Sequence, residues 1–363
     1  MVFVFPFWKP GMSSCTWFAL LLVCIAAACS SPAADQAGPP TVVLGAPLDS
    51  VTDLDAPEVA LEVAPGIVVL PAPTLPGLIR LHLANGTRDS VGRAGDRPGE
   101  FRSPFFAQSV NAREILVLDG LARRLLRFDR ALSFREQFNP PSELPPFTLR
   151  YDSLGSAYSV ASAAGPFREG DSLAILRRRT NGGSIDTIAF VRRLRLHGLE
   201  FANTMMMVPA EYAPRDLWGV LLDGTVWIGR GSLRELEFIA PDGARRVVPL
   251  LFEPIATVEA DRALFRGFPA PEAVRTVTRV IAPNKGPFQE IRADDAGHLF
   301  LWLNQPAGYS RELVAEFGAE GELLRTIALP LGSKIVAVSE THVYTTQESP
   351  DGTWVLRRHP RPS

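Results

Sequence analysis

The chain has 363 residues, 46% of them hydrophobic, and its 37 Lys and Arg residues nearly balance its 39 Asp and Glu residues, giving a formal net charge of -2. This composition allows a sizeable core and excludes a disordered or collagen-like chain. The basic residues occur in short bursts without one long tract, so we expect no nucleic-acid partner.

The first residues of the chain have the pattern of an export signal. An apolar run extends from Ser14 to Ala28, is preceded by Lys9, and is closed by small residues. This order of charge, apolar run and small residues is typical of a signal peptide. The run is shorter than the about 20 residues of a membrane-spanning helix, and a polar, proline-bearing stretch follows it. We therefore expect a signal peptide over residues 1–28.

Cys29 stands directly after this run. All three cysteines, Cys15, Cys24 and Cys29, lie in or at the edge of the signal, which leaves the folded part without a thiol. The segment from Ala26 to Cys29 resembles the lipobox of bacterial lipoproteins, although Ala26 replaces the usual Leu. The resemblance implies lipidation at Cys29, a flexible tether over residues 29–40, and membrane attachment through the lipid alone, at the outer membrane if the host has one. Ordinary cleavage after Ala28, releasing a soluble protein, is the alternative.

Short apolar strands separated by tight turns recur along the rest of the chain. Asn85-Gly86, Asp223-Gly224 and Asp242-Gly243 each lie between two such strands. These dipeptides favour type I′ hairpin turns, because both central residues need positive φ. The first hairpin turns of six successive units fall near residues 66, 112, 155, 224, 297 and 340. Three of the intervals between them match the about 40 to 50 residues of one four-stranded propeller blade.

The two longer intervals contain insertions between blades, around Leu196 to Arg215 and Leu251 to Pro287. The first carries Met205 to Met207, an adaptable apolar group that we expect to pack beneath the insertion. The second contains TVEADRALFRG, in which Leu264 and Phe265 fall on one face of a short predicted helix together with Val258.

The sixth unit has only three predicted strands, over residues 335–339, 342–347 and 354–359. A blade without its outer strand would expose an unpaired edge. The strand TVVLG, Thr41 to Gly45, precedes the first complete unit and is predicted to close the last blade. The sequence thus predicts an all-β fold, a six-bladed β-propeller over residues 41–360 that is closed by an N-terminal strand and carries two inter-blade insertions.

One loop of this predicted ring has a recognisable sequence. Residues Gly92 to Pro104 read GRAGDRPGEFRSP, and the strands that follow contain LDG and RFD. The loop resembles the inter-blade loop of NHL-type six-bladed β-propellers, and the mature chain resembles the secreted bacterial lipoproteins built on that fold. The other five blades carry only degenerate versions of the motif. The resemblance implies a fold rather than an activity.

The motifs that usually mark catalysis or metal binding are absent from the sequence. The five histidines include no pair at a metal-ligand spacing, and His298 and His342 follow equivalent turns, which indicates a structural role. Asp294-Asp295 precedes Ala-Gly in a predicted hairpin, where an Asp side chain caps its own turn. The glycines of the Gly92 to Pro104 loop lack the Gly-Lys-Ser/Thr of a phosphate loop and suit tight backbone turns. We expect no cofactor and no catalytic residue.

The resulting functional prediction is an envelope-anchored, non-catalytic propeller that binds a protein, a peptide or a glycan. Loops carry function more often than the scaffold that positions them. The inter-blade loops and the two insertions are predicted to share one face of the ring, near the mouth of the central channel. The residues predicted to bind there are Arg123, Glu211, Tyr212, Arg215 and Tyr309.

Two alternatives remain open from the sequence. One is a metal-dependent hydrolase that resembles gluconolactonase-type six-bladed propellers, in which acidic and amide side chains lining the channel hold a divalent cation. Its candidate ligands here are Asp152, Asp216, Asn284 and Asp294, whose spacing has no recognisable signature. The other is a purely structural component of the envelope.

Overall fold

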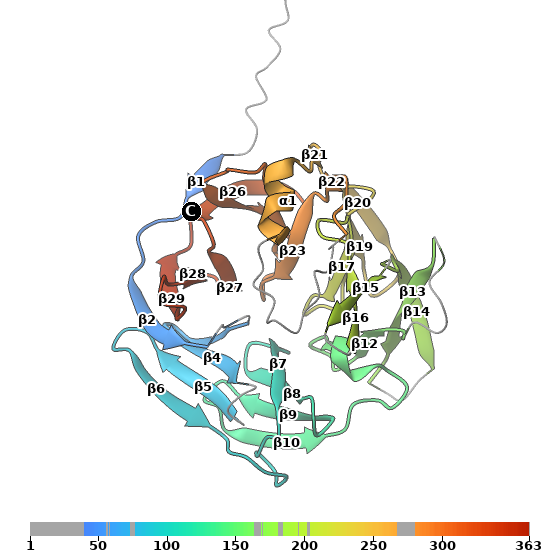
Figure 1. Ribbon diagram of the computed structural model, residues 1–363. Helices are drawn as coiled ribbons and strands as arrows, with labels where there is room; N and C mark the ends of the chain where they lie inside the picture. Colours follow the sequence, from blue (N-terminus) through green and yellow to red (C-terminus); the bar gives the residue numbers. More distant parts are fainter. Residues whose placement is uncertain are drawn as a thin grey trace, which may run out of the picture. The chain divides into compact units, whose positions relative to one another are not determined.

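The computed structural model describes residues 40–362, apart from residues 56, 58, 73–76, 163–167, 169, 181–183, 195, 202–203 and 267–279. The predicted signal, Cys29 and most of the tether lie outside the described residues, and so does the predicted turn at residues 181–183. Six small, mainly antiparallel sheets are arranged in a ring around a common centre (Figure 1). The fold is a six-bladed β-propeller, as the turn spacing predicts.

Each blade is built from four antiparallel strands, numbered from the channel outward. In blades 1 and 2 these are β3 (Leu61–Ala64), β4 (Ile67–Ala72), β5 (Gly77–His82) and β6 (Thr87–Val91), then β7 (Pro104–Ser109), β8 (Glu114–Asp119), β9 (Arg124–Asp129) and β10 (Phe134–Phe138). In blades 3 and 4 they are β11 (Arg150–Tyr151), β12 (Ala157–Val160), β13 (Ser172–Arg178) and β14 (Ile185–Arg192), then β17 (Asp216–Val220), β18 (Val226–Arg230), β19 (Glu235–Ile239) and β20 (Arg245–Pro249). In blade 5 they are β23 (Phe288–Ala293), β24 (Leu299–Leu303), β25 (Arg311–Phe317) and β26 (Leu323–Pro330). Blade 6 uses β27 (Lys334–Val338), β28 (His342–Glu348), β29 (Trp354–Pro360) and β2 (Asp49–Leu54), and a short 3₁₀-helix, η1 (Pro146–Thr148), precedes β11.

The hydrophobic core lies between successive blades. The second strand of a blade is covered on both sides, so it is continuously apolar: all five residues of β24, LFLWL, are buried. The outer strand faces solvent and is polar, as in TRDSV of β6. One core cluster joins Leu236 and Phe238 of blade 4 to Leu299 and Phe317 of blade 5. Each blade therefore depends on its neighbours for the burial of its apolar face.

The alternation of strand direction gives the ring two different faces. The turns between first and second strands and between third and fourth strands lie at one end, which we call the turn face. The turns between second and third strands and the connections from one blade to the next lie at the other end, which we call the loop face. Both insertions belong to the loop face by this topology.

The glycine-rich loop at Gly92 to Pro104 is held by two buried residues of blade 2. Asp119 accepts hydrogen bonds from the backbone N–H groups of residues 102 and 103, each at 2.9 Å. Arg124 donates to the carbonyl oxygens of residues 95, 96 and 100, at 2.8–2.9 Å. Gly92 has φ +82°, and a Cβ there would lie 2.6 Å from the ring of Phe101. The loop is a backbone turn between blades, as predicted, and the charged side chains of Asp119 and Arg124 hold its backbone in place.

The N-terminal segment closes the ring differently from the sequence prediction. The prediction that Thr41 to Gly45 forms the outer strand of the last blade is wrong. Instead, β1 (Thr41–Val43) pairs in parallel with β26 of blade 5, and β2 supplies the outer strand of blade 6 by antiparallel pairing with β29. Asp49 forms an ion pair with Arg358 of β29. The closing segment therefore holds two blades rather than one.

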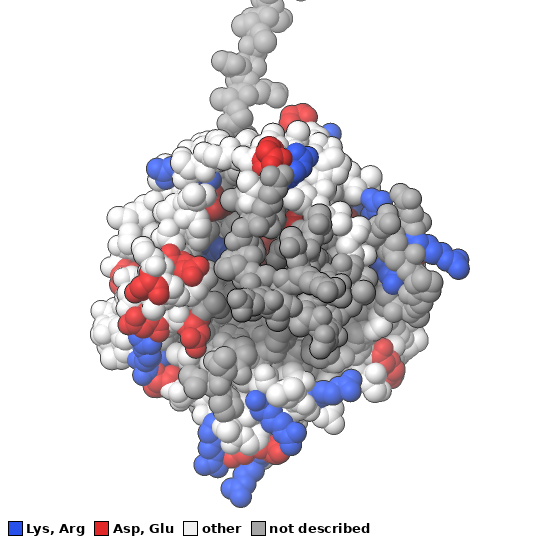
Figure 2. Space-filling view, in the orientation of Figure 1, with Lys and Arg blue, Asp and Glu red and all other residues white. Residues whose placement is uncertain are grey.

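The insertions contain the remaining elements. The first forms a hairpin of β15 (Leu196–Phe201) and β16 (Thr204–Pro209), and the side chains of Met205 to Met207 lie outside the described part. The second contains β21 (Ile255–Ala256), α1 (Glu259–Arg266) and β22 (Asn284–Lys285), which confirms the predicted helix. Figure 2 shows the face on which α1 lies, where the visible charges form small groups of both signs.

Candidate functional site

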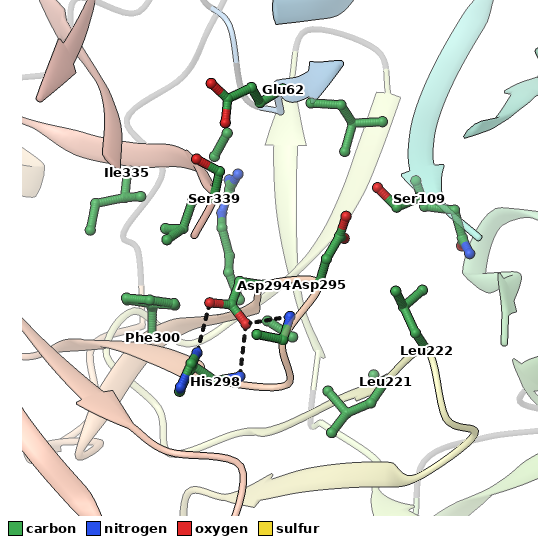
Figure 3. Close-up of a pocket in the computed structure, with 18 of the residues that line it drawn as sticks. Glu62, Ser109, Leu221, Leu222, Asp294, Asp295, His298, Phe300, Ile335 and Ser339 are labelled. Carbon is green, nitrogen blue, oxygen red and sulfur yellow. Dashed lines mark hydrogen bonds and ion pairs between the residues drawn. The ribbon is translucent and has the colours of Figure 1, made fainter. Parts of the chain in front are cut away.

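A cavity of about 1280 Å³ runs along the axis of the ring. It is lined by the innermost strands β3, β7, β11, β17, β23 and β27, and by the turns that follow β7, β17, β23 and β27 at the turn face. Figure 3 shows Glu62, Ser109, Leu222, Asp295 and Ser339, from five different blades, arranged around this space. The cavity therefore combines side chains that are far apart in the sequence.

An ion pair crosses the cavity at the turn face. Arg130 of blade 2 donates to the carboxylate of Asp295 of blade 5 at 3.0 Å, and these two blades stand opposite each other in the ring. Arg130 also donates to the carbonyl of Glu62 at 2.7 Å and to Ser109 Oγ at 3.0 Å. Asp295 points toward the side on which Ser109 lies (Figure 3). This arrangement narrows the end of the channel that is opposite the insertions.

A second charged cluster lies beside it. Asp294 accepts hydrogen bonds from the backbone N–H groups of Ala296 and His298, which is the turn-capping role that the sequence predicts. Its other oxygen accepts from His298 Nδ1 at 2.9 Å (Figure 3), and from Arg361, also at 2.9 Å. Arg361 also donates to Glu316 at 2.7 Å. The cluster ties the C-terminal residues of the described chain to blade 5, so Asp294 and His298 serve the packing of the ring.

The four candidate metal ligands do not fit a metal site. Asp152 and Asp294 cap hairpin turns at the turn face, whereas Asp216 and Asn284 lie at the loop face. Asp216 is ion-paired with Arg230 at 3.1 Å, and Asn284 is exposed in β22. Within the described residues there is no group of three or more His, Cys, Asp or Glu side chains that could hold a metal ion.

The structure places Glu211, Tyr212 and Arg215 in the segment that joins β16 to β17. Glu211 forms a parallel bridge with Ile281 of the second insertion, its N–H donating to the carbonyl of residue 280 at 2.8 Å. Arg215 donates to the backbone carbonyl of Gln289 in β23. Glu211 and Tyr212 thus help to join the two insertions, since the N–H of Gly286 donates to the carbonyl of Tyr212, whereas Arg215 contacts blade 5.

A buried ion pair stands at the centre of the joined insertions. Lys285 of β22 is 5% exposed and Asp261 of α1 is 1% exposed, and their Nζ and Oδ1 atoms are 2.6 Å apart. The ammonium also donates to the carbonyl of Gln305 at 2.6 Å and lies 4.7 Å from the centre of the Tyr212 ring. Burial raises the pKa of Tyr212, with further contributions from the Asp261 and Glu211 carboxylates. Sequence reasoning missed this ion pair, although Lys285 is one of only three lysines in the chain.

Arg123 and Tyr309 occupy equivalent turns on opposite sides of the ring. Arg123 is exposed between β8 and β9 with φ 51°, and Tyr309 is exposed between β24 and β25. Both turns lie at the loop face, but none of the five predicted binding residues lines the axial cavity. The structure therefore presents two separate candidate sites, the axial cavity and the loop face.

None of the helices that the structure describes has the length and apolar character needed to cross a bilayer.

The sequence matches no protein-family profile and no curated protein. Among solved structures, the chain is similar to a member of the DUF4221 family from Bacteroides vulgatus, with 10% identity, 88% of this chain and 98% of that chain covered, and a TM-score of 0.47. It is also similar to a candidate exported protein from Bacteroides fragilis, with 9% identity, coverage of 89% and 98%, and a TM-score of 0.49. A calcium-binding protein, regucalcin, from Agrobacterium tumefaciens matches with 12% identity, coverage of 88% and 96%, and a TM-score of 0.37. These are distant likenesses, and the fold assignment rests on the sheet topology of this chain.

Proposed function

We propose that this protein is an exported, lipid-anchored and non-catalytic β-propeller that binds a protein or peptide of the cell envelope through its loop face. A glycan, the third ligand class that the sequence leaves open, is disfavoured by the aliphatic character of the exposed side chains described below. The observation that carries the proposal is the joining of the two insertions by the Glu211–Ile281 bridge and by the contact of the Tyr212 ring with Lys285.

The union matters because neither insertion is needed to complete a blade. Each of the six sheets is complete without residues of β15, β16, β21, β22 or α1. Loops without a function need not pack against each other, whereas here the strand bridge between Glu211 and Ile281 and the contact of the Tyr212 ring with Lys285 join the two insertions. A surface fixed in this way loses little conformational entropy when it binds a partner. The insertions therefore have the physical character of a prepared binding surface.

The distribution of exposed apolar side chains also favours the loop face as the binding surface. Of fifteen large apolar side chains exposed in the described residues, eight belong to loop-face connections or insertions and two to turn-face hairpins. The eight are Leu121, Leu196, Leu233, Leu251, Val258, Val280, Tyr309 and Leu331. Exposed apolar area that gathers on one side of a molecule marks an interaction surface. Seven of these eight side chains are aliphatic, which favours a protein or peptide partner.

The proposed location follows from the first 40 residues. The signal pattern and the lipobox resemblance support export and acylation at Cys29. A tether of residues 30–40, fully extended, would reach at most about 40 Å from the membrane. This length would leave the loop face free to meet an envelope partner.

The test compares two matched sets of substitutions. Replacing Leu251, Val258 and Val280 with Ser removes apolar area from the loop face, and replacing Leu154 and Ile185 with Ser does the same at the turn face. After cross-linking in intact cells and purification, mass spectrometry should recover the partner with the wild-type and turn-face proteins but not with the loop-face variant. Equal recovery by all three, at unchanged melting temperatures, would contradict the proposal.

A further inference from the structure

Five arginines line the axial cavity, and four of them face a carboxylate. The ion pairs are Arg130 with Asp295 at 3.0 Å, Arg292 with Glu290 at 2.6 Å, Arg325 with Glu316 at 3.2 Å, and Arg361 with Asp294 at 2.9 Å. The fifth is Arg150, which has no carboxylate partner in the described part of the chain. The cavity thus keeps one guanidinium that no carboxylate of the described residues neutralises.

The surroundings of Arg150 hold its guanidinium in one place. Its carbon Cζ lies 4.3 Å from the centre of the Phe106 ring in blade 2, and its Nη1 donates to the carbonyl of Leu149 at 2.8 Å. Burial lowers the pKa of Arg150 from its ordinary 12.5 to about 10, so it remains charged at neutral pH. Its Nε and Nη2 atoms make no hydrogen bond to any described residue. These two atoms form the edge of the guanidinium with which an arginine binds a carboxylate through two parallel hydrogen bonds.

The neighbouring blade leaves room beside this edge. Arg150, Gly219 and Arg292 occupy equivalent positions in β11, β17 and β23, each two residues before the N–H that closes its hairpin. A Cβ at Gly219 would lie 2.4 Å from the Trp227 ring, so this position contributes only backbone. Trp227 also lines the cavity, and its buried indole N–H has no hydrogen-bond partner among the residues that the structure describes. A gap therefore lies between the two arginines at this level of the channel.

The total charge of the lining selects the kind of anion. Against the five arginines stand six carboxylates, those of Glu62, Glu290, Asp294, Asp295, Glu316 and Glu340. A doubly charged phosphate would meet repulsion from this excess, whereas a single negative charge is balanced by Arg150 alone. The same wall carries Phe106 and, in β17, Trp218 and Val220, which offer an apolar surface to the rest of a ligand.

We propose that the axial cavity binds a small organic monocarboxylate. The carboxylate accepts hydrogen bonds from Nε and Nη2 of Arg150, and the apolar body of the ligand lies against Phe106, Trp218 and Val220. This site is separate from the loop face, so the proposal does not depend on the proposed partner-binding function. An anionic metabolite in the channel would give the propeller a small-molecule ligand in addition to its macromolecular partner.

The experiment uses the purified full-length chain and four probes. Binding of phenylacetate, benzoate, benzyl alcohol and inorganic phosphate is followed by tryptophan fluorescence, because Trp218 and Trp227 line the cavity, and by calorimetry. The carboxylates should bind saturably, and the neutral alcohol and phosphate at least about ten-fold more weakly. Arg150→Met should weaken carboxylate binding by about 30-fold, as expected for loss of charge-assisted hydrogen bonds. Arg135→Met, which removes the same charge from an exposed position in the outer strand β10, should leave it unchanged.

Three outcomes would overturn the proposal. They are equal carboxylate binding by wild type and Arg150→Met, tighter binding of phosphate than of either carboxylate, and no saturable binding of any probe by the wild-type protein. If the methionine variant fails to fold, Arg150→Lys serves in its place, since it keeps the charge but loses the planar fork. That variant should bind carboxylates about ten-fold more weakly than wild type, and undiminished binding would also contradict the assignment.

Discussion

At Lys285, three segments of the loop face meet around one charge. The ammonium contacts Asp261 of α1, the carbonyl of Gln305 in the blade 5 turn, and the ring of Tyr212 from the first insertion. Burial alone would raise the pKa of Asp261, but hydrogen bonds from Lys285 and from the N–H of Val258 outweigh it, and the pKa falls below its usual value. Asp261 also sits in the first turn of α1, where a negative charge is favoured by the helix dipole.

Replacing Lys285 with Met should therefore destabilise the insertions. The substitution leaves the Asp261 carboxylate buried without its partner, which costs about 3 kcal/mol or more in comparable cases. The double variant Lys285→Met with Asp261→Met should recover much of this loss, since no charge is then buried. Urea unfolding measures the global effect, and hydrogen exchange over residues 255–286 measures the local one. A double variant less stable than the single one would show that the pair is not the source of the stability.

The lipid anchor is predicted at a single residue. Replacing Cys29 with Ser should move the protein from the membrane fraction to the soluble fraction, because acylation needs the thiol. Cell fractionation with immunoblotting is sufficient, and Cys24→Ser, within the signal, is the matched control that should stay with the membrane. Continued membrane association of the Cys29 variant would show that another feature holds the protein there.

Single residues differ in how far the sequence predicts them. The turn-capping role of Asp294 could be predicted because it depends on the next four residues, and the structure confirms it. The lack of a carboxylate partner for Arg150 could not be predicted, because it becomes unusual only when the other four cavity arginines are seen to be paired. The mix of apolar and charged residues in the first insertion predicts Tyr212 as a binding residue, and only the fold shows that its ring lies over Lys285.

At the level of elements, β2 and not β1 completes blade 6. The sequence prediction chose TVVLG because β-branched residues favour strands. In DSVTDL only Val51 and Leu54 are buried, three residues apart, because the strand has a bulge in which Asp53 adopts φ 57°. A bulge breaks the two-residue alternation by which a strand is recognised. The existence of an N-terminal closing strand was predictable, and its identity was not.

Two deletions separate the roles of these strands. Removing residues 49–54 should expose the edge of β29 and the core around Val51, lowering the melting temperature and promoting aggregation. Removing residues 41–43 takes away only the outermost strand of blade 5 and should lower the melting temperature less. Differential scanning calorimetry and light scattering measure both. A larger loss from the shorter deletion would mean that β1 is the essential closure.

His359 makes the closing segment sensitive to acid. Its Nδ1 donates to the carbonyl of Gly45 at 2.7 Å, and its Nε2 lies 3.0 Å from Thr345 Oγ1. Burial lowers the pKa of His359 below its usual 6.5, outweighing the hydrogen bond to Gly45, and the charge of Arg357 lowers it further. The unfolded chain then binds the proton more readily than the folded one, so stability is complete above about pH 6.5 and is lost as pH falls through the folded pKa.

Melting temperatures measured between pH 7.5 and pH 5 test this effect. The wild-type protein should lose stability over this range, and His359→Asn, which keeps a donor for Gly45 and cannot be protonated, should lose less. His82→Asn, at a partly exposed site in β5, is the control and should follow the wild type. If the melting temperatures of all three proteins fall equally with pH, protonation of His359 is not the cause of the loss of stability.

For the whole molecule, the ring could be predicted because tight turns between short apolar strands mark each blade in the sequence. The spacing of the first hairpin turns, four of which contain Gly, gives the number of blades, and the six blade sheets confirm it. The two sites could not be predicted, because both depend on contacts between distant blades. The axial cavity joins six inner strands, and the loop-face surface joins two insertions that are separated in sequence by the whole of blade 4.

The binding role of the loop face is tested most directly by site-specific photocross-linking in living cells. A photoreactive phenylalanine analogue at Tyr309 presents the probe on the loop face, and the same analogue at Leu154, which is the more exposed position, presents it on the turn face. We predict a discrete cross-linked adduct from position 309, absent from position 154. An adduct from position 154 alone, or identical products from both positions, would contradict the proposal that this face binds the partner.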